Sequence, residues 1–126
     1  MNENELSRII YESAIEVHRT LGGPGLLEKV YEEALVWELQ QARVKVNRQV
    51  ALPIIYKNNQ LVSPLKIDLL VGDRVIVECK ATLQMHEVYK AQLLTYLRLT
   101  SLKLGLLINF GSIRVKDGIS RVVNGL

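Results

Sequence analysis

The sequence predicts an α/β or α+β fold, in which one β-sheet carries helices on its faces. Two segments near the N-terminus have apolar residues spaced three and four apart, which is typical of amphipathic helices. A middle segment is rich in Val and Ile and is broken by Asn-Asn and Gly-Asp, which favours strands joined by hairpins. A third helical pattern and a short apolar run follow. The order ααβββαβ(β) therefore predicts a single sheet with packed helices.

Length and composition favour one globular domain over residues 1–126. Of the 126 residues, 48% are hydrophobic and 23% are charged, which are ordinary values for a domain with one core. We expect no membrane helix, because no apolar run reaches roughly 18 residues, and the polar start MNENELSR is not a secretory signal. The single Cys79 excludes an internal disulfide, which fits a cytoplasmic location. The net charge of +3 allows nucleic acid as a partner.

The helices are expected over ELSRIIYESAIEVHRTLG, over GGPGLLEKVYEEALVWELQQAR and over HEVYKAQLLTYLRLTS. Gly22-Gly23 ends the first helix, and a Gly/Pro break opens the second. Three strands are expected near residues 47–57, 60–71 and 74–80. A further strand in KLGLLINFG and an edge strand in SRVVNGL would complete the sheet.

The hairpin around Gly72 places two carboxylates on one face. A two-residue loop would set Ile67 opposite Glu78, so that each face mixes charged and aliphatic side chains. A three-residue loop, 72–74, gives one wholly apolar face and sets Asp68 directly opposite Glu78, with Lys80 beyond. We favour the three-residue loop because it separates core from charge.

Two directly opposed carboxylates have Cβ atoms about 5 Å apart, so they repel one another, and burial strengthens the repulsion. Either one carboxyl holds a proton, or a cation lies between the two. A hard divalent ion such as Mg²⁺ takes carboxylate and water ligands and would relieve the repulsion. The alternative is a solvated pair of acids with Lys80 as an ordinary salt-bridge partner.

Asp68 followed by Glu78-Cys79-Lys80 resembles the signature of the PD-(D/E)xK nuclease superfamily, in which an Asp ends one strand and E-x-K lies on the next. Ile67 stands where the superfamily name has Pro. The segment GLLEKVY at 25–31 is similar to the pattern that names the GxxExxY family. QLLTY at 92–96 resembles the Gln-x-x-x-Tyr motif of the RecB-like branch, and the resemblance extends from about residue 6 to 124.

The resemblance implies a restriction-endonuclease-like core with a mixed sheet flanked by helices, and it implies a metal site. Asp68 and Glu78 would hold Mg²⁺ or Mn²⁺, with the backbone carbonyl of Cys79 as a further oxygen. Lys80 would orient or activate the attacking water and stabilise charge on the phosphate. Glu28 would reach in from a helix as a further acid and a candidate metal ligand.

The same resemblance assigns positions on the third helix. Gln92 would position water, Lys80 or the phosphate, and Tyr96, one turn later, would line the same wall. Basic residues near the site would contact the phosphates of the substrate without reading its sequence. The candidates for these contacts are Lys66, Lys90, Arg98 and Arg114.

These expectations combine into a metal-dependent nuclease that hydrolyses phosphodiester bonds of DNA, in repair, recombination or defence. A bound metal lowers the pKa of a water and neutralises phosphate charge, and a lysine ammonium adds electrostatic stabilisation. A homodimer would offer a second cut site, and a protein partner would supply sequence specificity. The alternative is a catalytically silent module that keeps the nuclease fold to bind nucleic acid or protein.

Overall fold

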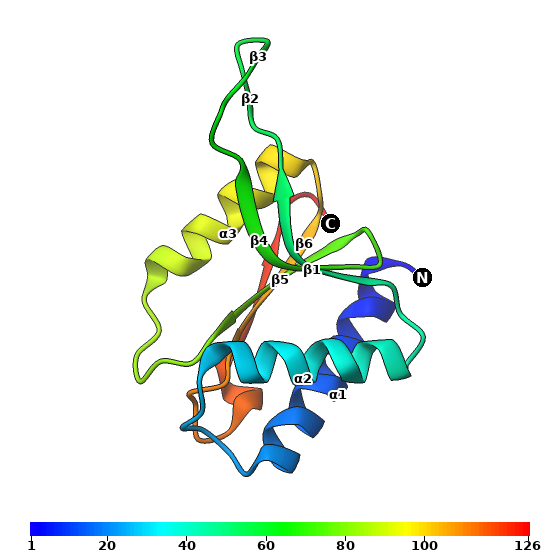
Figure 1. The fold of residues 1–126 in the computed structure, drawn as a ribbon, viewed down its shortest axis with the longest axis vertical. Coiled ribbons are helices and arrows are strands. Elements are labelled where there is room, and N and C mark those ends of the chain that lie inside the picture. The colour runs from blue at the N-terminus through cyan, green and yellow to red at the C-terminus, as the bar shows by residue number, and fades with distance from the viewer.

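A mixed five-stranded sheet forms the centre of the protein in the computed structural model, which describes residues 1–126 (Figure 1). The strand order is β1-β4-β5-β6-β7, with β5 and β6 parallel and the other neighbours antiparallel. This arrangement confirms the predicted α/β fold. The helices are α1 (Glu3–Leu21), α2 (Glu28–Gln41), α3 (Glu87–Thr100) and the 3₁₀ turn η1 (Val115–Gly118). The strands are β1 (Val46–Leu52), β2 (Ile55–Tyr56), β3 (Asn59–Gln60), β4 (Leu65–Val71), β5 (Val75–Lys80), β6 (Leu104–Asn109) and β7 (Ile119–Val123).

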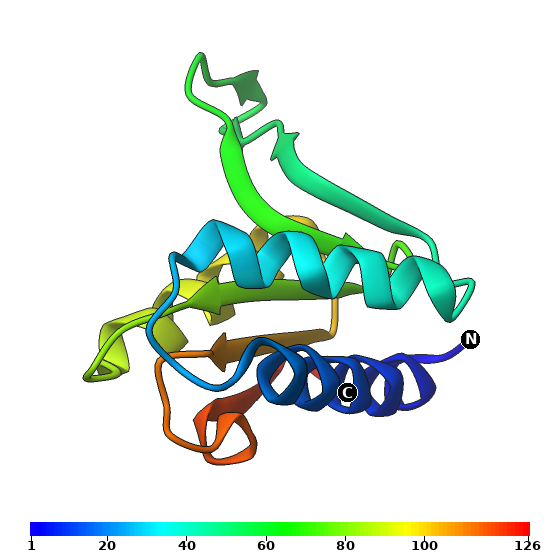
Figure 2. The ribbon, with the colours of Figure 1, turned by 60° about the horizontal axis from the view of Figure 1, so that its bottom comes forward.

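Helices cover both faces of the sheet. The larger core cluster joins α1 and α2 to one face, where Leu69 and Val77 are fully buried. The smaller cluster joins α3 to the other face through Ile76, Leu93 and Leu107. Figure 2 shows α1 and α2 lying together on one side of the strands. No helix is long and apolar enough to cross a membrane.

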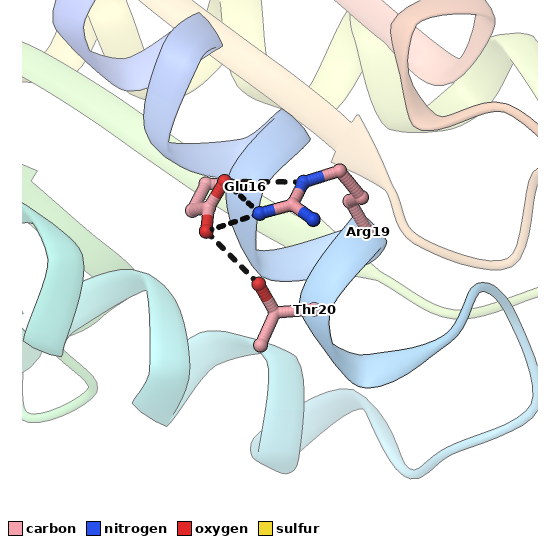
Figure 3. A network of polar contacts seen from close by, with 3 residues as sticks. All are labelled: Glu16, Arg19 and Thr20. Atoms are coloured by element: carbon pink, nitrogen blue, oxygen red, sulfur yellow. Dashed lines mark hydrogen bonds and ion pairs between the residues drawn. The ribbon is translucent and has the colours of Figure 1, made fainter.

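The first helix begins and ends close to where the sequence predicts. Asn2 and Glu5 form a reciprocal capping box at its start, and Gly22 ends it with a φ of 94°. On its solvent face, the Glu16 carboxylate accepts hydrogen bonds from Arg19 and Thr20 (Figure 3). These groups are exposed, so the network adds little to stability.

The second helix begins at Glu28, later than the Gly/Pro break from which the sequence predicts it. A loop precedes it, in which Gly25 has a φ of 116° that only glycine adopts readily. The buried Tyr31 fixes this loop: its hydroxyl donates to the Gly23 carbonyl at 2.7 Å and accepts from the Leu26 amide at 3.1 Å. The Tyr31 ring also stacks on Phe110, with ring centroids 4.8 Å apart. The position of the α2 start therefore depends on one buried hydroxyl.

The predicted strands at 47–57 and 60–71 are wrong in extent. Strand β1 ends at Leu52 and β4 begins only at Leu65; the short strands β2 and β3 form a separate hairpin between them. Pro53 and Pro64 flank this hairpin, and a proline cannot donate to a ladder hydrogen bond. Lys57 and Asn58 both have positive φ, which makes the tight turn between the two short strands.

The predicted three-residue loop between β4 and β5 is confirmed. Val71 pairs with Val75, Leu70 with Ile76 and Leu69 with Val77. The ladder ends at the third of these pairs, so the backbone pair of Asp68 with Glu78 that the register predicts is not formed.

Replacing Tyr31 by Phe tests the role of its hydroxyl in the fold. The variant leaves the Gly23 carbonyl and the Leu26 amide without this partner, so we expect the free energy of unfolding to fall by about 1–2 kcal/mol in urea denaturation. Tyr11→Phe is the matched control, because Tyr11 packs on the same core cluster and its hydroxyl makes no hydrogen bond to the protein. Equal stability of the two variants would contradict this role.

Candidate functional site

The candidate site lies where β4 separates from β5. Beyond Leu69 and Val77, side chains replace the ladder: the Cys79 amide donates to Asp68 Oδ2 at 2.9 Å, and the Asp68 amide donates to Glu78 Oε1 at 3.2 Å. Each carboxylate thus satisfies a backbone N–H of the other strand. The two carboxyl groups meet across the gap between the strands.

The core changes side at the same point of β4. Leu69 belongs to the cluster under α1 and α2, whereas Ile67 and Leu65 belong to the cluster under α3. In a regular strand these three alternate positions would share one face. The wholly apolar face expected from the three-residue loop would also pair Ile67 with Cys79, and that part of the expectation is wrong, because β4 turns away at Asp68.

The contact between the two carboxyls controls their protonation. Burial, followed by the negative charge of Asp68, raises the pKa of the Glu78 carboxyl from 4.5 to about 8. Only 7% of the Glu78 surface is exposed, so water cannot stabilise a second negative charge. At neutral pH, protonated Glu78 hydrogen-bonds to the Asp68 carboxylate. Without a cation, a shared proton relieves the repulsion.

Helix α2 brings two further acids to this centre. Loss of hydration and the charge of Asp68 raise the pKa of Glu28, while Lys80 lowers it. Burial also raises the pKa of Glu32, which is one helical turn after Glu28 and only 4% exposed. Burial raises the pKa of the Cys79 thiol, and the charges of all four acids raise it further. All four carboxyls therefore lie close enough to the buried Cys79 to act on its charge.

Gln49 joins two of these acids. Its amide donates to Glu32 Oε1 at 2.7 Å and to Asp68 Oδ1 at 3.4 Å. Gln49 has a φ of 52°, a left-handed conformation that costs a side-chain-bearing residue of order 1–3 kcal/mol. Arg48 adds an ion pair with Glu32 at 3.6 Å. A strained residue of β1 thus holds two of the acids in place.

Lys80 brings positive charge to the same centre. It is half-buried at the end of β5, and it lowers the pKa of both Glu28 and Glu78. Its Nζ lies 4.4 Å from the centroid of the Tyr89 ring, a cation–π distance. Tyr89 therefore limits where the ammonium group can go.

Helix α3 forms the opposite wall. Burial raises the pKa of Tyr96, and the charges of Glu78 and Asp68 raise it further, so Tyr96 lies near the carboxyl pair. Gln92 lies one turn before Tyr96 on the same side of the helix, and it is exposed without a hydrogen bond to the carboxylates.

The expected phosphate contacts are dispersed. Lys66 is exposed on β4, two residues before Asp68 and at the same phase of the strand. Lys90 pairs with Glu87 at 3.5 Å. At 100° per residue, Lys90 and Arg98 each lie about 120° or more around the helix from both Gln92 and Tyr96. The structure does not bring Lys90 and Arg98 to the side of α3 that carries those two residues. Arg114 is exposed in the segment before η1.

The donor set fits an ion that keeps most of its water. No three His, Cys, Asp or Glu side chains are arranged to hold a metal by themselves. Asp68 and Glu78 do match the one or two carboxylates that Mg²⁺ takes together with waters and substrate oxygens. The Cys79 amide points towards Asp68, and the carbonyl of a strand residue points the same way, here beyond the end of the β4–β5 ladder. That oxygen therefore also faces the gap.

Three residues near this centre were not identified from the sequence: Glu32, Gln49 and Tyr89. Glu32 could have been found from the sequence, because it lies four residues after Glu28 and therefore on the same face of the helix. Nothing in the sequence indicated Gln49, since its position at the site depends on a left-handed backbone conformation within a strand. The short spacing from Lys80 to Tyr89 spans a loop whose path the sequence does not define.

Comparison with known proteins gives one match. A family model described as the PD-(D/E)XK nuclease superfamily matches residues 4–122. No curated protein and no solved structure matches the chain. The matched range includes every residue placed at the site above.

The raised pKa of Glu78 predicts how stability depends on pH without metal. The folded chain holds a proton that the unfolded chain releases near pH 4.5, so stability should fall as pH rises from about 4.5 to about 8. Each unit of pKa shift corresponds to about 1.4 kcal/mol, so the loss over this range should be on the order of 5 kcal/mol. Urea denaturation in EDTA across this range measures it.

Glu78→Gln should remove most of that slope, because its amide keeps the shape of the protonated acid without titrating. Glu33→Gln is the control, an exposed acid on α2 that should keep the pH dependence of the parent. An unchanged slope in Glu78→Gln would show that Glu78 is ionised in the folded chain at pH 7.

Proposed function

Because the chain belongs to the PD-(D/E)XK nuclease superfamily, we propose that it hydrolyses phosphodiester bonds of DNA with a divalent metal ion at Asp68 and Glu78. Nucleases of this superfamily act on nucleic acid and generally use divalent metals. The observation that carries the proposal is the carboxyl pair in contact, with Lys80 beside it. A chain without a use for this pair would replace it with apolar residues, which would be easier to bury.

Each residue has a role in this proposal. A metal ion, Mg²⁺ or Mn²⁺, would supply Lewis-acid stabilisation of the phosphate and a more acidic water. Asp68, Glu78 and the Cys79 carbonyl would hold it through oxygens. The Lys80 ammonium, held against Tyr89, would stabilise negative charge developing on the phosphate oxygens and orient the attacking water.

Residues of the two helices support this centre. Glu28 supplies a further acid from the start of α2, at a position fixed by the hydroxyl of Tyr31. Gln92 and Tyr96 line the substrate side from α3 and position water or phosphate. On these residues we assign the chain to the GxxExxY family and to the RecB-like branch with the Gln-x-x-x-Tyr motif. We further propose that residues 1–126 act as one nuclease domain, and that a homodimer or a protein partner supplies specificity.

Cleavage assays test the proposed function directly. Labelled single- and double-stranded DNA and RNA are incubated with Mg²⁺, Mn²⁺ or EDTA. We expect metal-dependent cleavage of DNA by the parent, and a fall of about 100-fold or more for Asp68→Ala and Lys80→Ala, because each removes charge stabilisation of the reacting phosphate.

Lys103→Ala, an exposed base in the segment after α3, is the control and should keep parental activity. Circular dichroism of each variant separates lost chemistry from lost folding. Metal-independent cleavage, or equal residual activity in all variants, would mean a contaminant. A well-folded parent inactive on every substrate would favour the silent binding module.

Metal binding can be tested without cleavage. Saturating Mn²⁺ or Mg²⁺ should raise the melting temperature of the parent by about 5 °C or more, since an ion bound only to the folded state stabilises it. The increase should be larger at pH 8.5 than at pH 6, because protonated Glu78 competes with the ion. Asp68→Asn should abolish it, and Glu33→Gln should not. An undiminished increase in Asp68→Asn would place the ion elsewhere.

A further inference from the structure

A two-stranded hairpin projects from the end of the sheet, away from the helices that cover its faces (Figures 1 and 2). We call residues 53–64, which contain β2 and β3, the arm. Except for the half-buried Ile54, every residue of the arm is exposed. Tyr56 and Ile55 each keep 58% of their surface in solvent. The core therefore gives no reason for this element.

From its position and chemistry we propose that the arm binds duplex DNA beside the cut site and lies in the major groove. The inference rests on the proposed function, because it places the same substrate on a second surface. Three observations carry it: the charge of the segment, the side chains at the tip, and the continuity of the arm with the strand that bears Asp68.

The chain carries only positive charge over residues 39–67, which include β1, the arm and the start of β4. No Asp or Glu occurs between Glu38 and Asp68. The basic residues in that stretch are Arg43, Lys45, Arg48, Lys57 and Lys66. Lys45 and Arg48 form ion pairs, whereas Lys57 and Lys66 form none. Lys57 lies at the tip of the arm and Lys66 near the start of β4, so both unpaired lysines are available to a phosphate backbone.

The tip carries side chains of the kind that can contact base edges. Asn58 and Gln60 are exposed and their side chains make no hydrogen bond within the protein, so both side-chain amides are free to donate and accept. Amide side chains bind adenine through paired hydrogen bonds in the major groove. Asn59 is instead used within the turn, where it donates to the Lys57 carbonyl at 3.0 Å. Lys57 Nζ lies 5.4 Å from the Tyr56 ring centroid, which keeps this lysine at the tip.

The shape of the arm favours B-form DNA over the alternatives. Two paired strands lie about 5 Å apart, and the major groove of B-DNA, about 12 Å wide, admits a two-stranded ribbon. The major groove of an RNA duplex is deep and narrow and would exclude it. A single strand has no groove at all. The arm therefore predicts a preference for duplex DNA.

The arm comes directly before β4, the strand that leads to the site. Asn58 precedes Asp68 by ten positions (68 − 58), a reach of at most about 33 Å at about 3.3 Å per residue. That is about ten base pairs of duplex at 3.4 Å each. Lys66 lies between the two on β4, exposed. A duplex that passes the site and continues for about one helical turn would reach the tip.

Binding in EDTA tests the arm without any cleavage. Fluorescence anisotropy compares the parent with Lys57→Ala and with the triple variant Lys57→Ala/Asn58→Ala/Gln60→Ala. The probes are a duplex of about 24 base pairs, a duplex of about 8, single-stranded DNA and duplex RNA. On the long DNA duplex we expect about 3- to 10-fold weaker binding for the single variant and more than 10-fold for the triple, with a salt slope lower by about 1 per lysine removed.

Lys116→Ala is the matched control, a lone lysine in η1, which lies at the bottom of Figure 1, opposite the arm. It should bind all probes as the parent does, and the arm variants should match the parent on the short duplex and on single strands. Unchanged binding to the long duplex, or an equal loss on duplex RNA, would overturn the inference. So would an arm that joins two copies of the chain, seen as a lower sedimentation coefficient of the triple variant.

The inference and the proposed function fail in different ways. If the chain is a nuclease but the arm does not bind DNA, the triple variant cleaves long and short duplexes as the parent does. If the arm binds DNA but the chain is not a nuclease, no DNA is cut with any metal, and the triple variant still binds the long duplex more weakly than the parent. Circular dichroism of the triple variant should be unchanged, because all three side chains are exposed.

Discussion

The separation of β4 from β5 at Asp68 is the feature on which the site depends. Up to Leu69 and Val77 the strands are joined by their backbones, and beyond them by two carboxylates that accept from backbone amides. This exchange opens a gap in the sheet without leaving those amides unpaired. It also forces two acids together in a poorly hydrated place, which only a proton or a cation can stabilise. One local change in pairing thus produces both the opening and its chemistry.

The second helix contributes two acids to the same opening, although the contacts that fix its start lie elsewhere. The hydroxyl of Tyr31 ties down the loop before α2, and its ring stacks on Phe110 at the end of β6. Glu28 and Glu32 follow on one face of the helix and lie beside the gap. The spacing of Gly25, Glu28 and Tyr31 therefore has a physical explanation. Gly25 allows the turn, Glu28 supplies negative charge, and Tyr31 fixes the loop.

The fold and the central pair could be predicted because two periodicities define them. Helical spacing and strand alternation gave the order of elements, and the requirement of one apolar face selected the loop that brings Asp68 to Glu78. The ladder's end could not be predicted, because alternation assumes that pairing continues. The strand expected at 60–71 failed for a reason visible in the sequence, since Pro64 lies inside it. The role of Gln49 could not be predicted, because its position requires a left-handed backbone conformation within a strand.

The charge distribution links metal and nucleic acid in one step. Four acids lie near Cys79, and only two bases, Lys80 and Arg48, lie beside them, so the centre repels a phosphate in the absence of a cation. The segment from β1 to β4 has the opposite character, with no acid before Asp68. A polyanion attracted by this segment would be repelled at the site until an ion neutralised the carboxylates. Binding of the ion and close approach of the phosphate should therefore be mutually favourable, because each reduces the unbalanced charge that the other meets.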